Sequence, residues 1–270
     1  MPKKEINAEN EFCIKDHNGL ELLKYELHKN KYYEADLRSL FLSLYRGLQV
    51  FDHPVVYRID LNFLSGFQPS SDNQELKAFT KSVKSHFWKE NTRFPGKSSF
   101  KIVSNTQAEQ RNQKASQYAD RFKPIIVWVK ERSTEKDPSK TSIHGEVLNR
   151  FHYHLVVITP IFHEKLIKEK LRDLWEKVCI SNQKAGCVDY CQKNPRILNS
   201  VGYYKLYGND GGKVRIHSNK FRECFKRCAY LCKTKQKPKC KYLKTTYATK
   251  DYQSYEEQLI AEIKGLKGAI

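Results

Sequence analysis

Two histidines on one predicted strand place the strongest constraint on how this chain folds. Residues 150–158 (RFHYHLVVI) are rich in β-branched and aromatic side chains, and they include His152 and His154. Residues i and i+2 of a strand point to the same face, so the two imidazoles are expected side by side. Adjacent imidazoles among apolar neighbours favour a shared divalent cation. The alternative is a pair of solvent-facing or hydrogen-bonded strand histidines.

The segments around this strand predict an α+β fold, a central antiparallel β-sheet flanked by helices. Residues 55–64 alternate, with Asp60 on the polar face, and residues 125–132 are strongly β in composition. Helical spacing of apolar residues marks 34–50, 73–91, 162–180, 219–233 and 254–266. Shorter strands are expected at 98–104, 187–198 and 200–207, with a turn at 208–212. Strands that follow one another in hairpins indicate antiparallel pairing.

A carboxylate is expected next to the histidine pair. The polar residues 133–148 predict a long hairpin loop, which would pair strand 125–132 with strand 150–158 and bring Glu131 near His152 and His154. Two imidazoles and one carboxylate make an open site whose mixed ligands suit Mn²⁺ or Mg²⁺, with Zn²⁺ as an alternative. Taken alone, Glu131 would be better interpreted as a surface ion-pair partner of Lys130 or Arg132.

The charge of the chain points to a polyanionic partner. Of its 270 residues, 49 are Lys or Arg and 30 are Asp or Glu, a net charge of +19 that favours nucleic acid over an anionic membrane surface. The longest apolar stretch is far shorter than the roughly 20 residues of a membrane span. With no secretory signal visible, we expect a cytoplasmic protein whose eight cysteines stay reduced.

The predicted helix 219–233 presents a candidate nucleophile. Its apolar stripe contains Cys224, Cys228 and Cys232, whose spacing favours buried core cysteines over a zinc site. Tyr230 lies on the opposite face, which also carries the cations Lys226, Arg227 and Lys233. Nearby positive charge favours the phenolate and attracts a phosphodiester. The alternative is an ordinary amphipathic tyrosine at a helix boundary.

Together these motifs resemble the HUH endonucleases, named for two histidines around one bulky hydrophobic residue. Here that motif is His152-Tyr153-His154, accompanied by YRIDLNF, WVKER and the Y-x-x-K element that runs from Tyr230 to Lys233. The closest resemblance, over about residues 55–235, is to the gene-two-type replication proteins of filamentous phages (inoviruses) and prophages. It implies residues 54–235 as the endonuclease domain. The residue pattern outside that range predicts residues 1–53 as an N-terminal helical extension and 236–270 as a basic C-terminal segment with a terminal helix.

The resemblance also implies a function and a set of site residues. The protein would nick and join single-stranded DNA at a replication origin and start rolling-circle-type replication of a phage or prophage in a bacterial host cell, with host helicase and polymerase as candidate partners. His152, His154 and Glu131 would hold Mn²⁺ or Mg²⁺, Tyr230 would form a 5′-phosphotyrosine, and Lys233 would assist. Asp60 would be a second-shell or DNA-facing residue. The residues expected to contact DNA are Lys226, Arg227, Lys235, Lys237, Lys239 and Lys241.

Three alternatives stay open at this point. Tyr203 and Tyr207 show the Y-x-x-x-Y spacing of two-tyrosine relatives, although a single-tyrosine enzyme is the preferred interpretation. The basic charge alone would also suit a non-catalytic DNA-binding regulatory protein, and the motifs would equally suit an HUH transposase or relaxase. A metal-dependent hydrolase of a small substrate would leave the charge of +19 unexplained.

Overall fold

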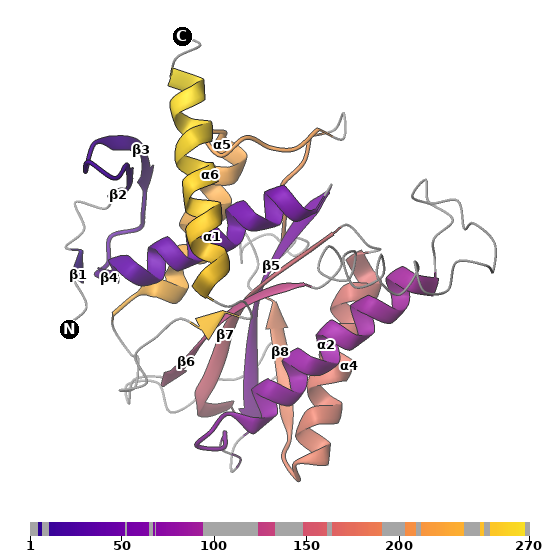
Figure 1. Cartoon of the computed structure of the whole chain (residues 1–270). Coiled ribbons are helices and arrows are strands. Elements are labelled where there is room, and N and C mark those ends of the chain that lie inside the picture. The colour runs from indigo at the N-terminus through magenta and orange to yellow at the C-terminus, as the bar shows by residue number, and fades with distance from the viewer. Residues whose placement is uncertain are drawn as a thin grey trace.

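The protein folds as a mixed α+β structure, as the sequence predicts (Figure 1). The structure, a computed structural model, describes residues 5–6, 11–51, 53–64, 67, 69–93, 124–132, 148–160, 164–190, 203–208, 212–234, 244–245 and 249–267. Several sequence predictions lie outside these residues. They are strand 98–104, nearly all of loop 133–148, the centre of turn 208–212, and Lys235, Lys237, Lys239 and Lys241.

Among the residues that the structure describes, six strands form an antiparallel sheet in the middle of the molecule. Its strands are β5 (Pro54–Leu64), β6 (Ile125–Arg132), β7 (Leu148–Pro160), β8 (Gly186–Tyr190), β9 (Tyr203–Lys205) and β10 (Lys244–Thr245). The order is β10-β6-β7-β5-β8, and β9 pairs with β5 beyond the end of β8. The predicted pairing of 125–132 with 150–158 is confirmed, because β6 and β7 are antiparallel neighbours.

Helices cover both faces of this sheet. On one face lie α2 (Gln74–Arg93) and α4 (Glu164–Ser181), which run side by side in Figure 1. On the other lie α1 (Glu34–Val50), α5 (Asn219–Cys228), the short 3₁₀ helix η2 (Ala229–Cys232) and α6 (Thr249–Lys267). In the described part of the chain, no helix combines the length and apolar character that crossing a bilayer requires.

The two faces of the sheet differ in polarity along the strands. Every second residue of β5, such as Tyr57, Ile59 and Leu61, packs with α2 and α4 in an apolar core. The opposite face begins apolar, and Val56 and Ile158 join the second core there. It then becomes polar toward the end of β5, which leaves room for a functional site beside α5 and η2.

The expectation that residues 1–53 form a helical extension is wrong for its first part. Residues 11–26 form a hairpin of β2 (Glu11–Lys15) and β3 (Glu21–Glu26), and the short strands β1 (Glu5–Ile6) and β4 (Tyr32–Tyr33) pair with each other. Each hairpin strand has only two buried side chains, too few to establish a period. The turn depends on Asp16, whose side chain accepts two backbone N–H groups, and on Gly19 with φ +80°.

The N-terminal hairpin shares an apolar core with the helix that precedes Tyr230. Phe12 and Tyr25 pack on Phe225 of α5, with ring centroids 5.3 Å apart in each pair. Phe41 of α1 contacts the same ring at 5.3 Å. These tilted and edge-on contacts are the favoured aromatic geometries. Packing of this kind fixes where α5 ends and therefore where Tyr230 lies.

Candidate metal centre

Six polar side chains gather on the sheet face that α5 and η2 cover. They project from the same face of three neighbouring strands: Arg58, Asp60 and Asn62 from β5, Glu131 from β6, and His152 and His154 from β7. The register places Glu131 opposite His152, and Asp60 opposite His154. Side chains alternate between the two faces of each strand, and directly opposed residues of antiparallel strands share a face. These two rules are sufficient to bring the six side chains together.

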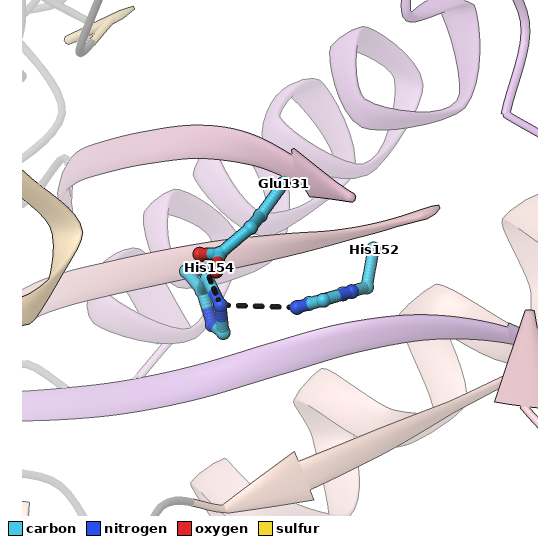
Figure 2. A group of neighbouring side chains, drawn as sticks. All are labelled: Glu131, His152 and His154. Carbon is cyan, nitrogen blue, oxygen red and sulfur yellow. Dashed lines mark hydrogen bonds and ion pairs between the residues drawn. The ribbon is translucent and has the colours of Figure 1, made fainter. Parts of the chain in front are cut away.

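Three of these side chains aim their ligand atoms at one another. The Nε2 atoms of His152 and His154 are 3.0 Å apart, and the Nε2 of His154 lies 2.8 Å from Oε2 of Glu131 (Figure 2). All three residues are buried, with exposed fractions of 3–5%. The proximity that the sequence predicts is therefore confirmed, whereas ligation of a metal remains a prediction.

The spacing of the three ligand atoms would allow them to bind one cation together. One ligand atom from each of the three residues falls within 4.8 Å of the others. Two ligands at about 2.1 Å from an octahedral ion and at right angles lie about 3.0 Å apart, close to the two separations above. Three donors on one side of an ion leave its other positions for water or substrate oxygens. Two nitrogens and one carboxylate suit Mn²⁺, Fe²⁺ or Zn²⁺, and Mg²⁺ less well.

Asp60 orients His154 from the other side of the ring. Its Oδ1 lies 2.5 Å from Nδ1 of His154, so the ring donates its Nδ1 proton to the carboxylate and turns Nε2 toward Glu131 and His152. The second-shell role of Asp60, which the resemblance implies, agrees with this geometry. Burial opposes ionisation, but the charges of His154 and Arg58 and the hydrogen bond lower the pKa of Asp60 below its ordinary range.

The same contacts act on His154. Burial favours the neutral ring, but the charges of Asp60 and Glu131 and their hydrogen bonds outweigh it and raise the pKa of His154 to about 9. The raised pKa favours the protonated ring at neutral pH, so a cation that bound at Nε2 would have to displace that proton. In metal sites where a carboxylate lies behind a histidine, the metal and a proton compete for the same ring nitrogen.

Tyr230 lies directly beside this cluster. Its ring centroid is 5.3 Å from that of His154, with an interplanar angle of 83°. The neighbouring residues Ala229, Leu231 and Cys232 of η2 are buried, while Tyr230 stays partly exposed. The predicted helix 219–233 is α-helical only to Cys228, because the chain then tightens into η2 and pairs with the N-terminal segment at Lys233.

Two cations contact the Tyr230 ring. Nζ of Lys233 lies 3.9 Å from the ring centroid, and Cζ of Arg58 lies 4.2 Å from it. Both distances are within the range of cation–π contacts. Burial and the charge of Arg58 lower the pKa of Lys233, against the opposing charge of Glu131. The Y-x-x-K spacing singles out Lys233, but nothing in the sequence singled out Arg58 among the 49 Lys and Arg residues.

The other sequence-predicted residues fall into three groups. Lys226 forms an ion pair with Glu26 at 3.5 Å, and Arg227 is half-buried on α5. Tyr203 and Tyr207, the alternative pair of nucleophiles, pack against the core on the α2–α4 side of the sheet, away from the histidines. Cys224, Cys228 and Cys232 are buried in the apolar core, which confirms their interpretation as core residues.

Comparisons with known proteins do not assign this chain to a family. The chain has no significant match among protein families, characterised proteins or solved structures. The function must therefore be argued from the site itself.

Proposed function

We propose that this protein nicks and joins single-stranded DNA by transesterification, with Tyr230 as the nucleophile. One observation carries the proposal: the phenol ring lies 5.3 Å from His154, at the edge of a two-histidine, one-carboxylate cluster. A nucleophile and a metal that act on the same phosphate must be neighbours. These residues come from three distant segments of the chain, and the fold brings them to one place.

The cluster and the tyrosine would divide the chemistry between them. His152, His154 and Glu131 would hold a divalent cation, whose contribution is to polarise the non-bridging oxygens of the scissile phosphate. The Tyr230 oxygen would attack phosphorus, so that one oxygen–phosphorus bond forms while the bond to the 3′ oxygen breaks. The proton lost by the phenol is matched by one gained at the departing 3′ hydroxyl. The phosphotyrosine keeps the bond energy for later strand joining.

Arg58 and Lys233 would stabilise the charge that develops during attack. Both contact the Tyr230 ring, and positive charge at that distance favours the phenolate over the phenol. Arginine cannot lose its charge, so Arg58 supplies this effect at any pH at which the protein is folded. Fixed charges in a shielded site require little reorganisation as the reaction proceeds.

The test is formation of a covalent adduct. The full-length protein is incubated with Mn²⁺ and a pool of random-sequence single-stranded oligonucleotides, and denaturing gels are read for label that moves with the protein. A 3′ label should follow the protein, since the 5′ phosphate of the downstream fragment is the part attached. A 5′ label should appear on shortened strands that end in a 3′ hydroxyl.

Matched variants identify the nucleophile. Tyr230→Phe should abolish the adduct and retain DNA binding, whereas Tyr203→Phe should leave the adduct unchanged because Tyr203 packs on the other side of the sheet. An adduct in Tyr230→Phe would refute the assignment. Wild-type protein that binds DNA but forms no adduct with Mn²⁺ or Mg²⁺ would favour the non-catalytic regulatory alternative. Rolling-circle replication of a phage or prophage, and the distinction from a transposase or relaxase, rest on the sequence resemblance alone.

A further inference from the structure

The connection between β3 and β4, residues 27–31, lies against the element that carries Tyr230. The backbone N–H of Thr234 donates to the carbonyl oxygen of Lys31 at 2.9 Å, and Tyr32 forms an antiparallel bridge with Lys233. The Tyr32 hydroxyl donates to the carbonyl oxygen of His28 at 2.9 Å, which holds the connection closed. The N-terminal segment is therefore attached to the residue three positions after the candidate nucleophile.

This connection presents a row of basic side chains. His28, Lys29 and Lys31 are exposed, and we call these three residues the basic bend. Partial burial and the charges of Lys226, Lys233 and Arg227 lower the pKa of His28, so the basic bend lies within electrostatic range of the cations around Tyr230. The nearby acids are Glu26, which pairs with Lys226, and Glu223, whose charge also reaches His28.

We propose that the basic bend binds backbone phosphates of the single strand next to the scissile linkage. The inference rests on the proposed function and assigns the N-terminal segment a role in substrate binding. A strand whose phosphate lies at Tyr230 must continue over the surface beside η2, and the basic bend borders η2 through the Lys233 and Thr234 contacts. Exposed lysines contact phosphates without reading sequence, so the contribution is to affinity and to strand position.

The experiment compares two double variants of the full-length protein. Lys29→Ala/Lys31→Ala removes two charges from the basic bend. The control Lys81→Ala/Lys177→Ala removes two exposed charges from α2 and α4, on the opposite face of the sheet. Binding of a fluorescein-labelled oligothymidylate of about 20 nucleotides is measured by anisotropy over a range of NaCl concentrations, with EDTA present so that no cleavage occurs.

The expected result is a local effect. Each lost phosphate contact should reduce the slope of log affinity against log salt by about 0.7, which amounts to about fivefold in affinity at about 0.1 M salt, or about 25-fold for both lysines. The control should stay within about twofold of wild type. Equal losses in the two variants, or an unchanged slope in the Lys29/Lys31 variant, would overturn the inference.

The outcome is separable from that of the proposed function. Binding is measured without cleavage, so a wild type that binds through the basic bend but forms no adduct refutes only the nicking activity. A wild type that forms the adduct while the Lys29/Lys31 variant binds normally refutes only the present inference.

Discussion

Replacing Asp60 tests whether a carboxylate behind His154 prepares it for a metal. The Asp60–His154 contact is 2.5 Å long and lies in a shielded environment, with His154 3% exposed and the Asp60 side chain 16%. Asp60→Asn keeps an oxygen that can accept the Nδ1 proton but removes the charge. Asp60→Ala removes the acceptor as well, so the ring loses the contact that directs Nε2 toward Glu131 and His152.

The expected loss follows from the strength of that contact. A hydrogen bond to a charged group contributes about 1.5–3 kcal/mol, and about 1.4 kcal/mol corresponds to tenfold in an equilibrium constant. We therefore expect metal affinity to fall about tenfold in Asp60→Asn and toward about 100-fold in Asp60→Ala, the range known for carboxylates behind ligating histidines. The ranking of the two variants is as informative as the size of either loss in metal affinity. Asp60→Asn removes only the charge, whereas Asp60→Ala also removes the hydrogen bond that orients His154.

The assay is calorimetric titration of the full-length protein with Mn²⁺ under anaerobic conditions. Asp60 also raises the pKa of His154, so removing it weakens the competition from protons and would hide part of the loss at neutral pH. The comparison is therefore made near pH 9, where that competition is small. Asp173→Asn, an exposed substitution on α4 with the same change of charge, is the control and should bind as wild type does. Unchanged affinity in Asp60→Ala would refute the positioning role.

Three further predictions concern the site and its support. Arg58→Gln should slow adduct formation about 10- to 100-fold at saturating DNA, with Arg58→Lys intermediate, as followed by rapid quenching. Gly186→Ala should lower the urea-unfolding free energy by about 1–3 kcal/mol, because a Cβ there would lie 2.7 Å from Nε1 of Trp175. Glu75→Gln should cost about 1–3 kcal/mol at pH 7, since it breaks the buried pair with Lys184. Burial raises the pKa of Glu75, but its hydrogen bonds prevail and lower it from 4.5, so that loss should vanish as the pH falls through the lowered value.

The central sheet and the proximity of Glu131, His152 and His154 could be predicted because local patterns determine them. Alternation over 55–64, 125–132 and 150–158 fixed which residues share a face, and a single hairpin assumption was enough to bring Glu131 to His152. The helix that precedes Tyr230 was predicted from its apolar stripe for the same reason. Each of these predictions depends only on the periodic spacing of apolar residues and, for Glu131, on the pairing of two strands that are neighbours in the sequence.

The remaining parts of the site depend on contacts between distant segments. Arg58 occupies an unremarkable polar position on its strand, and only the placement of η2 over β5 brings it to Tyr230. The N-terminal hairpin was not predicted because its strands contain too few buried residues for a period, although the Asn18-Gly19 pair in its turn is a hairpin signal that the sequence does carry. The end of α5 at Cys228 reflects pairing of Lys233 with the N-terminal segment, which no local pattern encodes.

The charges around Tyr230 explain why a carboxylate pair and a cation pair occur together. Arg58 and Lys233 contact the ring, while Asp60 and Glu131 contact the histidine beside it, so these four side chains nearly cancel. A divalent cation on neutral imidazoles would leave an excess of about two positive charges. A phosphodiester brings one negative charge, and ionisation of the phenol brings another. In the proposed reaction, the loaded site would approach neutrality only when a phosphate is bound and Tyr230 is losing its proton, which would be the moment of attack. Because uncompensated charge is costly in a shielded site, this balance would favour the reacting state over a metal-loaded site without DNA.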